Sequence, residues 1–273
     1  RRDRPHQQRQ QQRNHDGGGD RRAIGRQLQR QIINADRSGH LLAALEARGL
    51  NVVPAFATGL DARPAVEKFF LQNGRVTVDA VVSLTGFSLV GGPAYNDAKA
   101  AEEMLAGLDV PYLAAHAVEF QSLEQWGGSE RGLMPIEQTI MVAIPELDGS
   151  TGPMVFGGRS DGTGEACTGC ERRCVLPKGD AERNMHVCVD RAEMLAARVE
   201  KLVKLRRSQR AERKLAIVLF NFPPNSGATG SAAFLSVFAS LYNTLKSLKE
   251  AGYTVDVPAS VDALRNQIIT GNA

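Results

Sequence analysis

The feature that most constrains the fold of this chain is an alternation of short apolar runs with amphipathic stretches of helical length. Residues 78–86 read VDAVVSLTG, a continuous apolar run that is typical of a buried strand in a parallel sheet. The run at 110–116 is similar, and the stretch 96–108 between them predicts a helix with Asn96 as its N-cap. A strand, a helix and a second strand in this order predict a parallel, doubly wound α/β sheet of the Rossmann or flavodoxin type.

The same pattern extends along the chain. Strands are predicted at 51–58 and 154–158, and the stretch 134–149 predicts a short helix that leads into a strand. Further helices are expected at 63–74, 189–210, 231–252 and 260–271. Strongly apolar runs at 214–222 and 253–258 predict the strands of a second α/β unit.

Composition divides the chain into four parts. Residues 1–39 are rich in Arg and Gln and poor in apolar side chains, so we expect them to be disordered or foreign to the domain. A first α/β unit is expected at 40–160, a cysteine-rich loop at 161–190, and a second, incomplete α/β unit at 191–273.

The charge and hydropathy of the chain exclude several partners. The first 40 residues carry a net charge of +6 and the others −3, so the main part offers no surface for nucleic acid. No apolar run reaches the ~18–20 residues of a membrane helix. Because no signal peptide opens the chain, we expect a cytoplasmic protein.

All four cysteines lie within 22 positions of the chain. Cys167, Cys170 and Cys174 are closely spaced, and Cys188 follows after 13 intervening residues. In a cytosolic protein this clustering predicts ligands of zinc or of an iron–sulfur cluster, with His186 as a substitute ligand. Basic neighbours are expected to favour thiolates: Arg172, Arg173 and Lys178. The alternative is four free thiols in a flexible loop.

Two carboxylates, Glu146 and Asp148, lie in the sequence IPELDG at the end of a predicted strand. The carboxyl edge of a parallel sheet is where ligands bind, and carboxylates can hold Mg²⁺ or accept protons. The alternative is a turn, because Asp-Gly is a common turn pair. Glycine-rich loops at 84–95 and 221–234 are either anion sites or tight turns, and neither has the lysine of a phosphate-binding loop.

His116 and Trp126 are candidates for the lining of a pocket for a flat aromatic ligand. His116 follows a predicted strand, and Trp126 is the only tryptophan of the chain. A core tryptophan and a loop histidine are the alternative.

The chain resembles a known family over roughly residues 40–273. The resemblance is carried by VDAVVSLTGFSLVGGPAYNDAKAAEEML, VPYLAAHAVEFQSLEQWGGSERGLMPIEQTIMVAIPELDG, TGPMVFGGRSD and KLAIVLFNFPPNSGATGSAAFLSVF. These stretches are similar to the large (H) subunits of magnesium chelatases of bacteriochlorophyll synthesis, which are related to the large subunit of aerobic cobaltochelatase. Those subunits are several times longer, so the resemblance implies an internal fragment.

The resemblance implies a function in chlorophyll or bacteriochlorophyll synthesis. The large subunit of such an enzyme binds protoporphyrin IX and is the site of Mg²⁺ insertion, while two AAA+ partner subunits, I and D, hydrolyse ATP. Glu146 and Asp148 would then be catalytic, the four cysteines would hold an iron–sulfur centre, and His116 and Trp126 would contact the porphyrin. Cations for its propionates would be Arg63, Arg131 and Arg159.

Three other functions are kept as alternatives. The first is a fragment of a cobaltochelatase subunit with a corrin-type substrate. The second is a non-catalytic module that binds or senses porphyrin. The third is a structural metal-binding α/β protein. For a chelatase subunit, peripheral association with photosynthetic membranes is an alternative to a purely cytoplasmic location.

Overall fold

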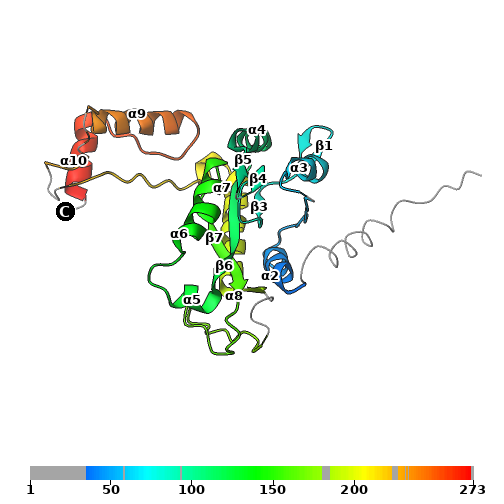
Figure 1. The fold of residues 1–273 in the computed structure, drawn as a ribbon. Helices are drawn as coiled ribbons and strands as arrows, with labels where there is room; N and C mark the ends of the chain where they lie inside the picture. The colour runs from blue at the N-terminus through cyan, green and yellow to red at the C-terminus, as the bar shows by residue number, and fades with distance from the viewer. Residues whose placement is uncertain are drawn as a thin grey trace, which may run out of the picture. The chain divides into compact units, whose positions relative to one another are not determined.

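Four strands form the main sheet, in the order β3-β6-β7-β8 (Figure 1). The long central strand β6 (Tyr112–Ser122) pairs in parallel with β3 (Val81–Ser83) and with β7 (Met154–Arg159). β8 (Met185–Val187) pairs with β7 in the antiparallel sense. The fold is therefore mixed α/β with a mostly parallel sheet, as the alternating pattern predicts.

The order of the strands in this sheet follows the order of the chain. A doubly wound sheet reverses its strand order at a switch point. The four strands lack such a reversal, so the finer prediction of a Rossmann or flavodoxin arrangement is not confirmed.

The computed structural model describes residues 35–57, 59–92, 94–179, 185–222, 227–230, 232 and 234–271. Most of the segment 1–39, which we expected to be disordered or foreign, therefore lies outside the described residues. The chain forms two compact units, residues 1–200 and residues 201–273, and each is described by itself. The boundaries that we expected from composition stay predictions.

Helices connect and flank the strands of the first unit. α4 (Ala98–Leu108) links β3 to β6, and its N-cap is Asp97, whose carboxylate accepts from the Ala100 N–H at 3.0 Å. The expectation that Asn96 caps this helix is therefore wrong by one residue, because only the Asp97 side chain reaches the first turn. Further helices include α2 (Ala35–Glu46), α3 (Arg63–Phe70), α5 (Leu123–Gly128) and α8 (Val189–Arg207).

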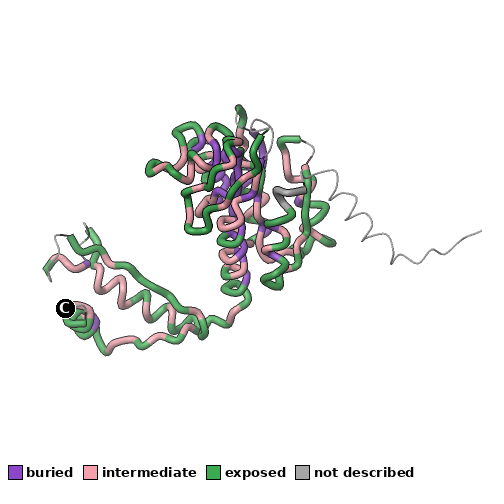
Figure 2. The backbone as a smooth tube through the Cα atoms, turned by 90° about the horizontal axis from the view of Figure 1, so that it is seen from below, coloured by how far each residue is buried: buried purple, intermediate pink, exposed green. Residues whose placement is uncertain are grey.

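One apolar cluster joins α3 and α4 to the sheet. Its buried members come from both helices, from β3, β6 and the loop after β3: Val66, Val81, Leu89, Val90, Ala101, Leu108 and Tyr112. Figure 2 shows buried residues concentrated on the sheet and along part of α8. The core thus fixes the loop after β3, which belongs to the candidate site.

The stretch 134–149 is helical, and the strand that we predicted before Glu146 is wrong. It consists of α6 (Pro135–Gln138), a π-helical turn (η1, Thr139–Ala143) and α7 (Ile144–Leu147). The buried side chains within these three elements, Glu137, Met141 and Pro145, recur at every fourth position. This spacing is that of a helix with one buried stripe, and it overrides the β-branched run that suggested a strand.

Two further predictions differ from the structure, which contains two short hairpins. Residues 51–57, within the strand that we predicted at 51–58, pair with no strand among the described residues, and Phe56 is exposed. The helix predicted at 63–74 ends at Phe70, and β1 (Leu71–Gln72) pairs with β2 (Arg75–Val76). The turn residues Asn73 and Gly74 both have positive φ, which is the backbone of the Asn-Gly turn favoured in hairpins. A second hairpin joins β4 (Gly91–Gly92) to β5 (Tyr95–Asn96).

The second unit contains α9 (Val237–Glu250), α10 (Val261–Gly271) and a short 3₁₀ turn, η2 (Arg210–Glu212). In its described residues the apolar runs 214–222 and 253–258 join no sheet, apart from one isolated bridge between Asn221 and Thr229. A strand is stable only beside a partner that accepts its hydrogen bonds and covers its side chains. Val218 is 92% exposed, so the second sheet that we predicted is not formed here.

Candidate functional site

The predicted site residues lie at different levels of the sheet. Trp126 follows β6, and Cys167, Cys170 and Cys174 follow β7, at the carboxyl ends where ligands of open α/β sheets bind. Glu146 and Asp148 instead precede β7, and His116 and Arg159 lie within strands. None of the described helices is long and apolar enough to cross a membrane.

The two carboxylates of IPELDG differ in their surroundings. Glu146 lies in α7 and is exposed, so its oxygens are available to a ligand. Asp148 is only 2% exposed and accepts from the Ser88 hydroxyl at 2.9 Å and from the Leu89 N–H at 2.6 Å. Burial raises the pKa of Asp148, and these two hydrogen bonds oppose the rise. Asp148 therefore ties the loop after β3 to the end of α7.

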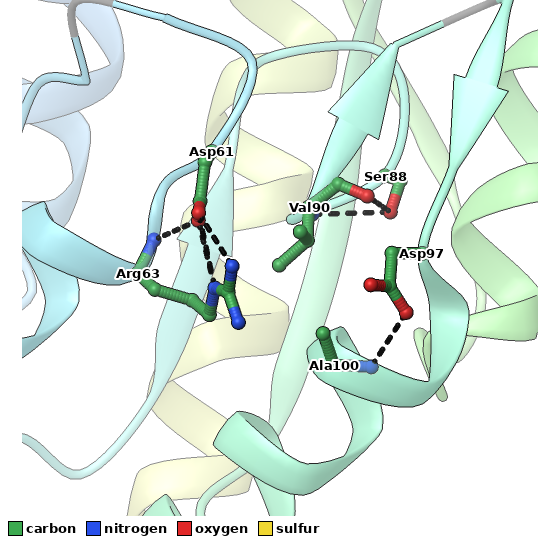
Figure 3. A network of polar contacts seen from close by, with 6 residues as sticks. All are labelled: Asp61, Arg63, Ser88, Val90, Asp97 and Ala100. Carbon is green, nitrogen blue, oxygen red and sulfur yellow. Dashed lines mark hydrogen bonds and ion pairs between the residues drawn. The ribbon is translucent and has the colours of Figure 1, made fainter.

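The loop after β3 is held from a second side by the segment before α3. The Ala62 N–H donates to the Leu89 carbonyl, and Asp61 forms an isolated bridge with Val90. Asp61 also pairs with Arg63 at 2.7 Å (Figure 3), and this contact lowers the pKa of the Asp61 carboxyl. The Arg63 guanidinium, which we considered for a propionate, thus already has a carboxylate partner.

His116 lies inside the sheet, opposite Val155 of β7, and only 1% of it is exposed. Neither ring nitrogen has a hydrogen-bond partner among the described residues. Burial lowers the pKa of His116 to about 4, so the ring is uncharged at neutral pH. A Cβ atom on Gly86 would lie 4.0 Å from Nδ1, so the loop after β3 passes beside the ring.

Trp126 lies with the cysteines and not with His116. It belongs to α5, and the Arg191 guanidinium stands 5.2 Å from the centre of its ring, within cation–π range. Trp126 and all four cysteines line one pocket, together with Leu123, Gly127, Gly169, Leu176, Val187 and Arg191.

Two backbone contacts join the two sides of the cysteine loop between residues 166 and 175. Ala166 and Val175 form an antiparallel bridge, and the Cys167 N–H donates to the Cys174 carbonyl at 2.9 Å. The Gly169 N–H donates to Cys167 Sγ at 3.4 Å. A Cβ atom on Gly169 would lie 2.7 Å from the Cα of Gly127, so these two glycines allow the loop to lie directly on α5.

At Cys174, burial outweighs the basic neighbour Arg172, which acts in the direction that we expected. Arg172 is paired with Glu193 of α8 at 2.7 Å. Burial raises the pKa of Cys174, nearby Cys170 raises it further, and Arg172 lowers it only in part. Burial also raises the pKa of Cys188, so both groups favour the thiol form.

The four cysteines are free thiols that share a pocket. In the described part of the chain, no three His, Cys, Asp or Glu side chains converge closely enough to hold a metal ion. His186 lies in β8 and does not line the pocket. The residues therefore do not fit a single tetrahedral ion such as structural zinc, whose four ligands lie about 2.3 Å from one centre.

Arg131 and Arg159 are both exposed. They differ from Arg63 because neither has an ion-pair partner among the residues that the structure describes. Arg131 lies between α5 and α6, and Arg159 ends β7. These two guanidinium groups are available to an anionic ligand.

Glu137 is a buried carboxylate that sequence reasoning missed. It is 0% exposed and accepts from the N–H groups of Phe120 and Met134 at 3.3 and 3.0 Å, and from the Gln121 side chain. It lies at N3 of α6, with Pro135 at N1. Pro at N1 and Glu at N3 are sequence signals for the start of a helix, although Met134 replaces the usual Ser or Thr of a capping box.

Comparison with known proteins identifies the family. The model of the family CobN/Magnesium Chelatase matches residues 3–273. The chain belongs to the CobN/magnesium chelatase family. The match includes most of the N-terminal segment, which the resemblance seen in the sequence did not cover.

The relatives of this chain include magnesium-chelatase subunits and a cobaltochelatase subunit. The chain is 51% identical to the magnesium-chelatase H subunit of Cereibacter sphaeroides and 48% identical to that of Rhodobacter capsulatus, and each comparison covers over nine-tenths of this chain. It is 30% identical, over 83% of its length, to the aerobic cobaltochelatase CobN subunit of Pseudomonas aeruginosa. The chain spans about a fifth of the length of the two magnesium-chelatase subunits and 17% of the cobaltochelatase subunit.

In this member of the CobN/magnesium chelatase family, the predicted residues separate into distinct places. Trp126 joins the cysteines in one pocket, whereas His116 is enclosed in the sheet. Glu146 is exposed, and Asp148 is engaged by the loop after β3. The expected single porphyrin pocket with His116 and Trp126 side by side is therefore not what the structure brings together.

Proposed function

We propose that this chain is part of the large (H) subunit of a magnesium chelatase and that it contacts protoporphyrin IX while Mg²⁺ is inserted. The observation that carries the proposal is the identity of 51% with a magnesium-chelatase H subunit, against 30% with the cobaltochelatase subunit. ATP is hydrolysed by two AAA+ partner subunits, I and D, as the resemblance implies. A cytoplasmic location, with peripheral membrane association as the alternative, is part of the same proposal.

In this proposal Glu146 is the carboxylate that meets the substrate. Insertion has to remove water from Mg²⁺ and two protons from the pyrrole nitrogens, and an exposed carboxylate can hold the ion and accept a proton. Glu146 is exposed at the end of α7, which supports this role. Asp148, which we predicted as a second catalytic carboxylate, is assigned the supporting role of holding the adjacent loop.

The test uses the full-length large subunit with its two partners, ATP, Mg²⁺ and protoporphyrin IX. Glu146→Gln is expected to keep porphyrin binding and to lower the rate of Mg-protoporphyrin formation. Glu103→Gln, an exposed carboxylate on α4, is the control and should leave the rate unchanged. An unaltered rate for Glu146→Gln at limiting Mg²⁺ would remove the catalytic role.

The same assay separates the alternatives. A sensing module binds the porphyrin but forms no metal complex when both partners and ATP are present. A cobaltochelatase subunit inserts Co²⁺ into a corrin-type substrate and leaves protoporphyrin unmetallated. Either result would replace the magnesium chelatase proposal.

We also propose that Cys167, Cys170, Cys174 and Cys188 hold an iron–sulfur cluster. Their place around one pocket supports a shared centre, and the family resemblance is the reason to prefer a cluster, which distributes its thiolate ligands over several irons. Bound there, the cluster would supply order to the loop.

Anaerobic purification of the chain tests this second proposal. We expect a brown protein with iron and acid-labile sulfide, and loss of both in Cys170→Ser. A colourless protein with stoichiometric zinc would show a zinc site instead, and four titratable thiols without metal would show that no centre exists.

A further inference from the structure

Three apolar side chains are exposed where β6 ends and α6 begins. Phe120 of β6 is 55% exposed, and Met134 and Ile136 at the start of α6 are exposed to a similar degree. Exposed large apolar side chains that start from neighbouring points of the backbone are a common sign of a binding surface.

A single buried carboxylate holds these residues together. Glu137 accepts from the N–H groups of both Phe120 and Met134, so the two residues start from adjacent points of the backbone. Ile136 directly precedes Glu137 and lies two positions after Met134. We call Phe120, Met134 and Ile136 the apolar ledge.

The loop beside the ledge is also fixed. The Gln121 side chain, which donates to Glu137, donates to the Gly132 carbonyl at 3.3 Å. The Gln138 side chain donates to the Leu133 carbonyl at 2.9 Å. A surface that is held in place before binding loses little conformational entropy when a rigid ligand arrives.

One cationic residue belongs to the loop beside the ledge. Arg131 is adjacent in sequence to Gly132, whose carbonyl is held by Gln121, and its own N–H donates to the Ser129 hydroxyl at 3.2 Å. The Arg131 guanidinium is exposed and has no ion-pair partner in the described ranges of the chain. The ledge therefore combines apolar area with one available positive charge.

We propose that the apolar ledge binds one face of a tetrapyrrole macrocycle and that Arg131 binds one of its carboxylates. This inference rests on the proposed function and names the surface on which that substrate lies. A flat, rigid, apolar ring with carboxylates at one edge matches an apolar ledge with a guanidinium at its border. Glu137 is a positioning residue, because it touches the backbone of the ledge and not the ligand.

The test is a titration of the full chain with deuteroporphyrin IX and with its uncharged dimethyl ester, followed by absorbance. Phe120→Ser should weaken the binding of both ligands about tenfold or more, because it removes apolar contact area that does not depend on charge. Arg131→Gln should weaken the diacid by about three- to fivefold and leave the ester unchanged, which is the effect of one exposed ion pair.

Two matched variants control for general effects on the surface. Arg75→Gln removes another exposed arginine without an ion-pair partner in the described residues, and Phe56→Ser removes another half-exposed phenylalanine. Both should bind the two ligands as the unmodified chain does. Urea unfolding of every variant checks that the fold is kept.

The possible results distinguish this inference from the function on which it rests. If the unmodified chain binds neither ligand, the proposal that this chain contacts the porphyrin is refuted, and the proposal for the ledge is refuted with it. If the chain binds both ligands but Phe120→Ser and Arg131→Gln bind as tightly as the controls, only the ledge is refuted. Equal losses with diacid and ester in Arg131→Gln would refute the assignment of Arg131 to a carboxylate.

Discussion

Replacement of Asp148 tests whether this carboxylate is structural. In Asp148→Ala the Leu89 N–H loses its acceptor while it stays buried, whereas the Ser88 hydroxyl can still donate to the Val90 carbonyl, 3.1 Å away. One buried donor without a partner costs about 1–3 kcal/mol. Release of the buried carboxylate returns part of this cost, because burial already disfavours the charged form of Asp148. We expect the free energy of unfolding to fall by about 2 kcal/mol.

The conservative variant Asp148→Asn should cost less, about 1 kcal/mol, because its amide oxygen still accepts from the Leu89 N–H. Glu146→Ala is the matched control, two positions away and exposed, and should change the free energy of unfolding by less than about 0.5 kcal/mol. The assay is urea unfolding followed by the fluorescence of Trp126, the only tryptophan, which lies in the first unit.

The pH dependence gives a second measurement. Because the pKa of Asp148 is raised above its ordinary 3.8, the folded chain binds more protons than the unfolded chain between the two values. The contribution of Asp148 to stability is therefore complete below pH 3.8 and decreases as the pH rises through the raised pKa. Asp148→Asn should remove this decrease. Equal urea midpoints for Asp148→Ala and Glu146→Ala would refute the structural role and restore Asp148 as a catalytic candidate.

Two further predictions concern the buried histidine and the cysteine loop. Since burial lowers the pKa of His116 from 6.5 to about 4, its contribution to stability is complete above pH 6.5 and is lost as the pH falls toward 4; His116→Leu should flatten this part of a urea-midpoint profile, and an unchanged slope would contradict the assigned burial. Gly169→Ala places a Cβ atom 2.7 Å from the Gly127 Cα and should cost about 1–3 kcal/mol and speed the reaction of the four thiols with a disulfide reagent. Gly128→Ala, whose Cβ atom would lie 3.4 Å from Thr168 Oγ1, is the control; equal thiol reaction rates in the two variants would show that the loop does not depend on the contact between the glycines.

Local patterns predicted those parts of the fold that depend on neighbouring residues. The run at 78–86 does contain β3, the run at 110–116 contains the start of β6, and the stretch between them does form α4. The strand predicted within 134–149 is wrong, because the apolar run there suited either a strand or a helix. Burial of every fourth side chain decided for the helix, and that burial depends on segments far away in the chain.

The candidate site shows the same division. The sequence drew attention to IPELDG, but only the structure separates exposed Glu146 from Asp148, because Ser88 and Leu89 lie about 60 positions earlier. Glu137 went unnoticed because its three partners come from β6 and from the start of α6. Hydrogen bonds over such separations leave no periodic pattern in the sequence.

By itself, the sequence determined the family, the α/β class and the gathering of all four cysteines in one segment, because these follow from residue identity and local periodicity. The tertiary structure alone decided that His116 is enclosed and that Trp126 lies among the thiols. The physical reason is that burial and pairing are properties of the packed chain. A side chain acquires its solvent exposure, its partner and its pKa only when residues distant in sequence are placed beside it.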